Sequence, residues 1–429
     1  MAPGGKPENC PVEVNLERLV SGLRAGQERL RAVPVDDLIG LLDAAGQAWT
    51  QPGNAVAEIV RDLAMGFLPL WLRRANLEPI LAQTLRGDRR VLDGFVPQPS
   101  SPGRQHRAQP RGVLVHWVAG NVALLGMISV IQGLLTKNAN LVKVSRQNAG
   151  ILPYFLAALG QVRYRRPDGE EISGTLLTDA VRAIYTDRED TAAATAISTL
   201  ADVRVAWGGR EAVEAIVNLP RRFGTEDIVF GPKTSFVVVG AEMLHAEAGA
   251  RKVAGEVARD TVALSQRGCN SPHTVFVERG GLVAPAGFAA LLAEELGRIS
   301  QRVPADVTPQ ESFQILGWRA EYDMRGQAWY SNGVRWSVFF SNEDSGLASP
   351  CYGRTLFVRP LDNVFEVAPV CSVNTQTAGL ALGERRLKLA EVLTARGVER
   401  CPEVGRMSLY DVPWDGMYPM DRMVRWVSA

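Results

Sequence analysis

The feature of this sequence that most constrains its fold is a stretch without Asp, Glu, Lys or Arg, residues 112–136. The β-branched run at 112–118 predicts a strand, Ala119-Gly120-Asn121 predicts a turn, and residues 122–135 are apolar enough for a buried helix. A second short strand is predicted at 141–144. Together these elements form a βαβ unit. The sequence therefore predicts a parallel α/β sheet with a ligand crevice at the carboxyl ends of its strands.

The uncharged stretch is also long enough to cross a membrane. Three glycines, together with His116, Asn121 and Gln132, interrupt it and favour the buried strand and helix, so we expect no membrane span. The net charge of +1 predicts no nucleic-acid partner. The polar opening of the chain, residues 1–11, predicts no signal peptide and a cytoplasmic protein.

The five cysteines are odd in number and scattered, which is typical of a reducing compartment and not of a disulfide framework. The four histidines form no cluster with metal-ligand spacing, so we predict no metal site. From residue context alone, Cys269 competes with Cys351 and Cys371 as a reactive thiol. The alternative for each of them is a small buried apolar residue.

Strands and helices continue to alternate beyond residue 181, which indicates a doubly wound parallel sheet. Residues 12–98 have helical spacing and predict a helical layer packed on that sheet. Residues 378–394 are also predicted to be helical. No G-x-G-x-x-G fingerprint or Walker motif is present, so an ordinary dinucleotide site is not predicted.

Several motifs in this chain occur together in one superfamily. W-V-A-G-N at 117–121 is followed by N-A-N-L-V-K-V-S at 138–145, and Cys269 follows a Gln-Arg-Gly segment within 264–277. In these motifs the chain resembles the aldehyde dehydrogenase superfamily. Over residues 35–427 it resembles in particular the LuxC-type acyl-CoA reductases, the reductase component of fatty acid reductase systems.

The resemblance implies an aldehyde dehydrogenase-like α/β fold in four regions. Residues 1–100 are the N-terminal helical region, and residues 101–232 are the doubly wound nucleotide-binding domain. Residues 233–385 are the α/β catalytic domain that carries the cysteine. Residues 386–429 are a C-terminal segment that packs back on the nucleotide-binding and oligomerisation region.

The resemblance assigns the catalytic roles to Cys269 and Asn121. Cys269 is the nucleophile that forms an acyl-enzyme. Asn121, with a backbone N–H, is the donor to the oxyanion of the tetrahedral intermediate. The alternative for Asn121 is a helix cap or a turn residue. His273, four residues after Cys269, and His116, in a predicted core strand, are expected to be structural.

The nucleotide residues implied by the resemblance are Lys143, Ser145 and Arg146 for the adenosine ribose, and Gly208 and Gly209 for the pyrophosphate at a helix N-terminus. NAD-preferring members carry an acidic residue after this strand. Arg146 in that place favours a 2′-phosphate, and therefore NADPH over NADH. The alternatives are a solvated arginine at a strand end and an ordinary Gly-Gly turn.

Two residues of the oxidising aldehyde dehydrogenases are missing. Val229 stands where those enzymes carry the Glu that activates water, so hydrolysis of an acyl-enzyme is expected to be slow. Residues 350–354, P-C-Y-G-R, replace the segment with the ribose-binding Glu. Aromatic side chains at 318–340 could line an acyl pocket or fill a strand core. The alternation of Trp336, Val338 and Phe340 indicates a strand core equally well.

The resemblance predicts NADPH-dependent reduction of an acyl thioester, on CoA or a carrier protein, to an aldehyde through acyl-Cys269. A homo-oligomer and an acyl-transferring or acyl-activating partner protein are expected by family analogy. One alternative is a CoA-acylating aldehyde dehydrogenase that runs in the oxidative direction. The other is a non-catalytic nucleotide-binding subunit of a larger assembly.

Overall fold

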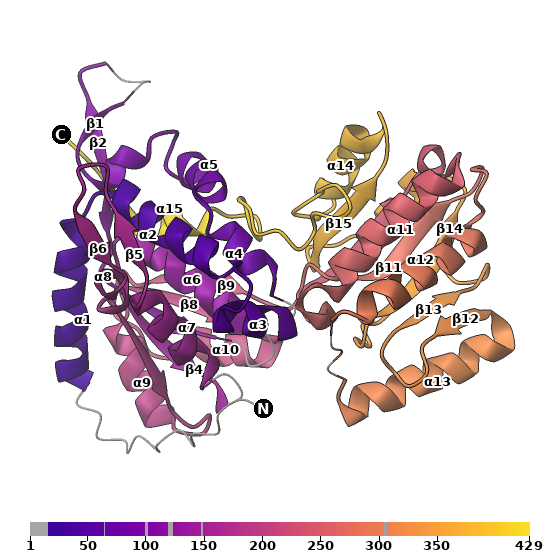
Figure 1. Cartoon of the computed structure of the whole chain (residues 1–429), viewed down its shortest axis with the longest axis horizontal. Coiled ribbons are helices and arrows are strands. Elements are labelled where there is room, and N and C mark those ends of the chain that lie inside the picture. Colours follow the sequence, from indigo (N-terminus) through magenta and orange to yellow (C-terminus); the bar gives the residue numbers. More distant parts are fainter. Residues whose placement is uncertain are drawn as a thin grey trace. The chain divides into compact units, whose positions relative to one another are not determined.

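The computed structural model describes residues 16–63, 65–98, 102–118, 123–146, 149–303, 305 and 307–429, without the side chains of residues 123–125. The chain forms two compact units (Figure 1). Unit 1 comprises Met1–Ala57, Leu68–Gly231 and Asp411–Ala429, and unit 2 comprises Glu58–Phe67 and Pro232–Tyr410.

Unit 1 is built on a five-stranded parallel sheet with the strand order β7-β4-β3-β8-β9. Its strands are β3 (Val113–Trp117), β4 (Ala139–Val144), β7 (Val181–Tyr185), β8 (Val203–Trp207) and β9 (Glu226–Phe230). The central strand β3 is buried throughout, which explains its apolar sequence. The chain winds outward from β3 first to one side and then to the other. The carboxyl ends of β3 and β8 therefore flank the crevice of a doubly wound sheet.

The helices of unit 1 cover this sheet. Those that follow its strands are α6 (Ala123–Leu135), α7 (Ile151–Gly160), α8 (Thr175–Thr178), α9 (Thr191–Leu200) and α10 (Arg210–Val217). The predicted βαβ unit is confirmed, since α6 joins β3 to β4. The uncharged stretch is divided between β3 and α6. Among the described residues, no helix combines the length and the hydropathy needed to cross a membrane.

The predicted N-terminal helical region is also confirmed. It contains α1 (Leu16–Arg31), α2 (Val35–Ala48), α3 (Ala55–Asp62), α4 (Phe67–Trp71), α5 (Arg74–Thr84) and the 3₁₀ turn η1 (Arg89–Leu92). Leu23 of α1 packs with Val113, Val115 and Ile197 in one buried cluster. The layer is held by this apolar contact with the sheet.

Short antiparallel strands complete unit 1. β1 (Val96–Pro97), β2 (Gln105–Pro110) and the C-terminal β16 (Val424–Ser428) form one sheet, and β5 (Arg163–Arg165) pairs with β6 (Glu171–Ser173). The short helix α15 (Pro419–Arg422) precedes β16. The last strand of the chain thus pairs with a strand that precedes the parallel sheet in sequence.

His116 on β3 is a core histidine, as the sequence predicts. Its Nε2 lies 3.0 Å from Asn140 Oδ1, to which it donates, so Nδ1 accepts from the Ser129 hydroxyl at 2.6 Å. Burial lowers its pKa to about 4, against the hydrogen bond with Asn140. The imidazole is neutral and satisfied, and its role is structural.

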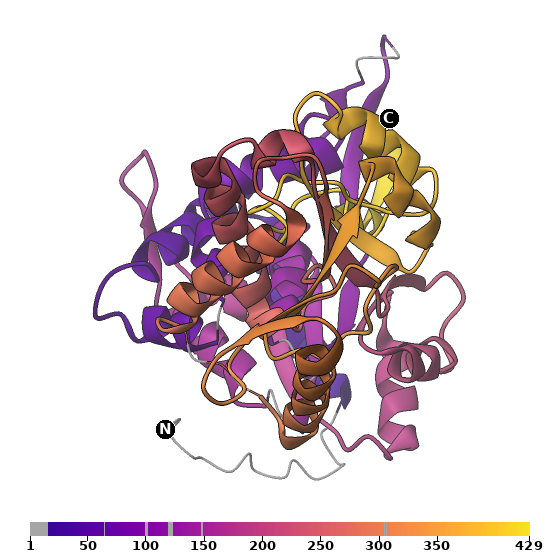
Figure 2. The ribbon, with the colours of Figure 1, turned by 90° about the vertical axis from the view of Figure 1, so that its right-hand side faces the viewer.

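Unit 2, coloured from salmon through orange to gold in Figure 2, contains a six-stranded sheet. Its strand order is β12-β13-β14-β11-β10-β15. Its strands are β10 (Thr234–Val239), β11 (Pro272–Glu278), β12 (Gln327–Tyr330), β13 (Ser337–Phe340), β14 (Thr355–Leu361) and β15 (Thr375–Ala381). Only β12 is antiparallel to its neighbour. One buried cluster packs one sheet face against α11 (Glu247–Val262) and α12 (Pro285–Ser300). Further clusters include the 3₁₀ turn η5 (Val364–Val370), α13 (Pro309–Arg325) and α14 (Arg386–Thr394).

The helix predicted at 378–394 is wrong in its first half. Residues up to Ala381 belong to strand β15, and the helix α14 begins only at Arg386. A side chain at Gly379 would meet Met407 Sδ at 2.5 Å and Val237 at 3.2 Å. The small residues that suggested a helix are required here by close packing on both sides of a buried strand.

Candidate active site

Cys269 lies in a loop that joins α11 to β11, here called the cysteine loop (residues 263–271). The loop begins with the 3₁₀ turn η4 (Ala263–Gln266), in which Leu264, Ser265 and Gln266 have φ of 52°, 51° and 62°. Three successive non-glycine residues in the left-handed region are strained, at a cost on the order of 1 kcal/mol each. Such a turn persists only when its surroundings hold it in place.

The Gln266 side chain holds the turn in this conformation. Its Nε2 donates to the carbonyl oxygens of Thr355 at 2.7 Å and Pro272 at 2.9 Å, and its Oε1 accepts from Thr355 N at 2.8 Å. The side chain is fully buried. Only an amide can both donate and accept in this way, so Gln266 binds the cysteine loop to the first residues of β11 and β14.

A second left-handed turn lies beside it. Tyr352, Gly353 and Arg354 have φ of 58°, 58° and 55°, and Thr355, the partner of Gln266, follows directly. This is the segment that replaces the ribose-binding Glu of the aldehyde dehydrogenases. The two strained turns of unit 2 therefore meet at one buried amide.

Cys269 itself is half-buried, and its sulfur has a defined donor. Gln376 Nε2 on β15 donates to Cys269 Sγ at 3.0 Å. The Ser235 hydroxyl on β10 donates to Cys269 O at 2.6 Å. These bonds fix both the backbone and the sulfur of Cys269.

The next residue, Asn270, is also fixed. Its Nδ2 donates to Met407 O at 2.8 Å, and the Met407 N–H donates to Asp260 Oδ1 at 3.1 Å. Asp260 accepts a further bond from Gly405 N at 2.6 Å. Burial raises the pKa of Asp260 to about 6, against these backbone donors. The segment at 405–407 is therefore a support for the cysteine loop.

The competing thiols lie in less suitable surroundings. Burial raises the pKa of Cys351 and of Cys371 to about 11, and that of Cys401 to about 12. A thiolate is the reactive form, so these environments disfavour a nucleophile. Cys269, with an amide donor on its sulfur, has the environment that favours one.

Two neighbours of Cys269 have other partners. Arg267 makes a bidentate ion pair with Glu311, at 2.7 and 3.0 Å, and Glu311 also closes the capping box of α13. His273 is buried with its ring edge-on to Tyr352, at 5.6 Å between centroids. Burial lowers its pKa to about 4, so the imidazole is neutral near pH 7.

Gln376 was not predicted from the sequence. It lies 107 residues from Cys269, and it falls next to the residues that were expected to be helical. The available signal was the polar Thr375-Gln376-Thr377 run at the start of a buried strand. Buried amides and hydroxyls require partners, and this run supplies one to the sulfur.

The predicted nucleotide residues lie at the carboxyl ends of the strands of unit 1. Lys143 is half-buried on β4, beside β3, with Lys143 O accepting from Val118 N at 3.4 Å. Burial lowers its pKa, against the charge of Asp187. Ser145 and Arg146 follow β4, and Arg146 is exposed. Asn121 lies outside the described residues.

Gly208 and Gly209 connect β8 to α10. Gly208 N donates to Phe230 O at 3.2 Å, and Gly209 is the N-cap of α10. The space next to Gly209 is open to 4 Å, so an anion can approach the first turn of the helix. An open helix N-terminus after β8, and a half-buried lysine and an exposed arginine at the end of β4, lie on either side of β3 and have the charge to hold a dinucleotide phosphate.

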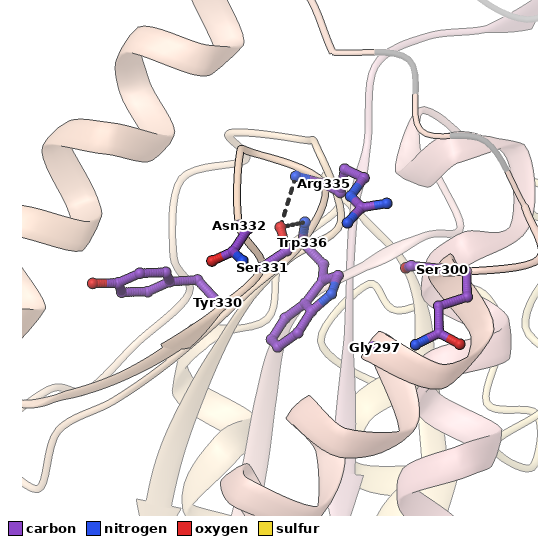
Figure 3. A pocket seen from close by; sticks show the side chains of 8 residues that line it. Gly297, Ser300, Tyr330, Ser331, Asn332, Arg335 and Trp336 are labelled. Carbon is purple, nitrogen blue, oxygen red and sulfur yellow. Dashed lines mark hydrogen bonds between the residues drawn. The ribbon is translucent and has the colours of Figure 1, made fainter.

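The aromatic residues at 318–340 divide into two groups. Trp318, Tyr322 and Phe339 pack in a core cluster with Ile315. Others line a cavity of about 330 Å³ at the end of α12 (Figure 3), whose lining is Gly297, Ser300, Gln301, Tyr330, Ser331, Asn332, Arg335 and Trp336. Most of these aromatic side chains therefore pack in the hydrophobic core, and the cavity is lined largely by polar residues.

The Acyl-CoA reductase (LuxC) family model matches residues 30–426 of the chain. A long-chain acyl-protein thioester reductase of Photorhabdus luminescens is 27% identical over 80% of this chain and 68% of the relative. One of Photobacterium phosphoreum is 26% identical over 92% and 80%. These matches cover most of the sequence.

The solved structures that resemble the chain include aldehyde dehydrogenases and proline utilization A. The enzyme of Bartonella henselae has a TM-score of 0.60 and 12% identity, and the match covers 96% of this chain and 90% of that one. An NAD-dependent benzaldehyde dehydrogenase of Corynebacterium glutamicum has a TM-score of 0.61 and 13% identity, with 96% and 90% covered. The predicted aldehyde dehydrogenase-like fold is confirmed.

Proposed function

The chain belongs to the LuxC family of acyl-CoA reductases, and we propose that it reduces an acyl thioester to the aldehyde with NADPH, through an acyl group held on Cys269. The single observation that carries the proposal is the fixed position of Cys269 with the Gln376 amide on its sulfur. The names of the relatives refer to the reduction of acyl-protein thioesters, which is the same chemistry.

The reaction proceeds in three steps on Cys269. Its thiolate attacks the thioester carbonyl, and the donor thiol leaves, so that the acyl group becomes bound to sulfur. A nicotinamide nucleotide, when bound, would supply the hydride, and with a proton from solvent the acyl-cysteine would become a hemithioacetal. The hemithioacetal then collapses to the aldehyde, and the electron pair of the C–S bond returns to Cys269.

Charge develops on the carbonyl oxygen in the first and second steps. Asn121 and the Cys269 N–H are the proposed donors to this oxyanion, and a preorganised donor of this kind contributes about 3–4 kcal/mol. Val229, on β9, replaces the Glu that activates water in oxidising relatives. With no carboxylate there, the acyl-enzyme survives long enough to be reduced.

The nucleotide is proposed to bind along the carboxyl ends of β4 and β8. Lys143 and Ser145 hold the adenosine ribose, and Gly208 and Gly209 admit the pyrophosphate to the first turn of α10. Arg146 binds the 2′-phosphate, which makes NADPH the preferred cofactor. Its exposed guanidinium supports this role.

The donor is proposed to be an acyl-CoA or a carrier-bound acyl thioester, delivered by an acyl-transferring or acyl-activating partner protein to a homo-oligomer in the cytoplasm. The reverse reaction, a CoA-acylating aldehyde dehydrogenase, uses the same residues. A non-catalytic subunit is not favoured, because such a protein has no use for an amide on a fixed cysteine sulfur.

The test is the intact mass of the protein after brief exposure to acyl-CoAs and to an acyl-carrier protein without nucleotide, beside Cys269→Ala. We expect an acyl adduct on the unmodified chain and none on Cys269→Ala. Adducts on both proteins would move the nucleophile to another cysteine. Adducts on neither would favour the non-catalytic alternative.

A further inference from the structure

A series of side-chain hydrogen bonds in unit 2 ends on the sulfur of Cys269. Arg400 Nη1 donates to Thr377 Oγ1 at 3.3 Å, and Thr377 Oγ1 donates to Gln376 Oε1 at 3.4 Å. Gln376 Nε2 then donates to Cys269 Sγ at 3.0 Å. In every bond of the series, the donor is the group that lies farther along the series from the sulfur. The series therefore runs from a guanidinium cation to a thiol in one direction.

The three side chains of the series are buried and held from the backbone. Gln376 and Thr377 are fully buried, and Arg400 is 6% exposed. Gln376 O accepts from Glu399 N at 3.1 Å and from Arg400 N at 2.9 Å. Arg400 Nη2 donates to Leu409 O at 3.0 Å. Little freedom is left for the amide to turn away from the sulfur.

The direction of the bonds has a chemical consequence. Because Thr377 donates to Gln376 Oε1, the NH₂ end of this amide is the end that faces Cys269. A hydroxyl that accepts from a cation is a stronger donor, and a bonded amide oxygen makes its N–H groups stronger donors in turn. Such a series stabilises negative charge on the sulfur more than it stabilises a neutral thiol.

We propose that Gln376 is a catalytic residue that holds Cys269 as a thiolate, and that Thr377 and Arg400 are positioning residues that orient and polarise its amide. The inference rests on the proposed function in one respect: the sulfur carries charge twice in that reaction. It is charged before it attacks the thioester and again when the hemithioacetal releases the aldehyde. One donor serves both the nucleophile and the leaving group.

The remaining charged and titratable groups on the segments around the cysteine loop leave a clean pH window. They are the ion pairs Arg267–Glu311 and Lys233–Glu399, the carboxyl of Asp260 with its pKa raised to about 6, the imidazole of His273 with its pKa lowered to about 4, the guanidinium of Arg354 with its pKa lowered to about 10, and the thiols of Cys351, Cys371 and Cys401 with pKa values raised by burial. The pKa values of Asp260 and His273 lie below 7, and that of Arg354 lies near 10. A change in reactivity between pH 7 and 9 therefore reports on Cys269.

The experiment is the rate of Cys269 alkylation by iodoacetamide from pH 6 to 10, followed by peptide mass spectrometry on the full chain without thioester or nucleotide. In Gln376→Leu we expect the midpoint of the profile to rise by about one pH unit, because a donor to the charged sulfur is lost. In Thr377→Val we expect a smaller rise, because the amide remains but is neither oriented nor polarised. Thr377→Ser keeps the hydroxyl and is expected to restore the original midpoint.

An unchanged midpoint in Gln376→Leu would overturn the proposal. A shift in Gln376→Leu with none in Thr377→Val would overturn the roles of Thr377 and Arg400. Thermal unfolding of each variant checks the fold. If Gln376→Leu does not fold, the near-isosteric Gln376→Glu places a carboxylate beside the sulfur and is expected to raise the midpoint further.

Because alkylation needs no substrate, this result is separable from the proposed function. If the Gln376→Leu profile is shifted but no acyl donor acylates the protein, the role of the hydrogen-bond series is supported and the proposed reductase function is contradicted. If the chain is acylated on Cys269 but Gln376→Leu shows no shift, the proposed function is supported and the role of the hydrogen-bond series is contradicted.

Discussion

The two parallel sheets of this protein build their sites at opposite ends of the strands. In unit 1 the predicted nucleotide residues follow β4 and β8, at the carboxyl ends. In unit 2 Cys269 precedes β11, and its supports Ser235, Thr355 and Gln376 stand at the beginnings of β10, β14 and β15. One unit thus follows the usual rule for ligand crevices in open α/β sheets, and the other does not.

The difference shows what each site needs from its sequence. At the carboxyl ends of strands the following helices present their N-terminal N–H groups, so glycines and one or two cations suffice for an anion. At the amino ends no such groups converge. There the protein uses side-chain amides, Gln266, Asn270 and Gln376, each with a defined hydrogen-bond partner. Substitutions of these amides in unit 2 should therefore affect stability and chemistry together, whereas substitutions of the predicted nucleotide residues in unit 1 should affect only nucleotide affinity.

The largest expected effect is that of Gln266→Ala. It removes the donor to Thr355 O and Pro272 O and leaves Thr355 N with only its weaker bond to Tyr352 O at 3.1 Å, and buried unsatisfied groups cost about 1–3 kcal/mol each. We expect the free energy of unfolding to fall by about 3–5 kcal/mol and Cys269 acylation to slow by at least about 100-fold. Urea denaturation and adduct mass measure the two quantities.

Gly209→Ala is the matched control in unit 1, since the space next to Gly209 is open and its φ is −66°. It should change the free energy of unfolding by less than about 1 kcal/mol. A Gln266→Ala variant as stable and reactive as this control would remove the distinction between the two units.

The second prediction concerns acid stability. The unfolded imidazole has a pKa near 6.5, whereas His116 and His273 have pKa values lowered to about 4 by burial. The unfolded chain therefore binds more protons between pH 4 and 6.5. Stability is full above about pH 6.5 and is lost as the pH falls toward 4, by about 3 kcal/mol for each histidine. Urea denaturation between pH 4 and 8 measures this loss.

The two histidines differ in how they can be replaced. His273→Leu should flatten the pH dependence with little loss at pH 7, because its Nδ1 has no hydrogen-bond partner among the described residues. His116→Leu should flatten it too, but should destabilise at every pH because Ser129 and Asn140 lose a partner. Equal losses at pH 7 would contradict this contrast.

The third prediction tests the independence of the nucleotide site. Lys143→Met removes a half-buried cation, and we expect NADPH affinity to fall by about 10–100-fold, because charge-assisted bonds contribute about 1.5–3 kcal/mol. Fluorescence titration with NADPH measures the loss. The alkylation profile of Cys269 serves as the control, and a change there would mean that the two sites are coupled.

The smallest expected effect is that of Arg146→Asp. The exposed guanidinium makes a screened contact with a 2′-phosphate, so the change should lower the preference for NADPH over NADH by about 10-fold. The ratio of the two Kd values at low and high salt measures it. A preference that is unaffected by both the substitution and the salt would place the 2′-phosphate elsewhere.

The elements that could be predicted from the sequence are those with a local sequence pattern. The βαβ unit was predicted because its strand, turn and helix are continuous in 112–144, and Cys269 was selected by its resemblance to a known motif. Gln266 was visible only as part of the Gln-Arg-Gly segment before Cys269. Its structural role depends on its hydrogen bonds with Thr355, 89 residues away in the sequence, and no local sequence pattern reveals this contact.

Gln376, Thr377 and Arg400 were missed for a related reason. The second half of the strand that carries two of them, Ala378–Ala381, has no β-branched residue and contains Ala and Gly, and Met407 and Val237 leave no room for a side chain at Gly379. Propensity therefore favoured a helix, and tertiary packing overrode it. A buried arginine linked to a cysteine through two intervening side chains arises from the three-dimensional fold and is not encoded in sequence periodicity.

The strained turn at Leu264, Ser265 and Gln266 has a consequence for sequence variation. Its left-handed residues and its buried amide stabilise one conformation only as a set, so substitutions among them should be strongly epistatic. Ser265→Gly would release strain at one position and leave the Gln266 bonds intact. Position 265 is therefore expected to tolerate substitution close to the proposed nucleophile, Cys269, whereas position 266 is not.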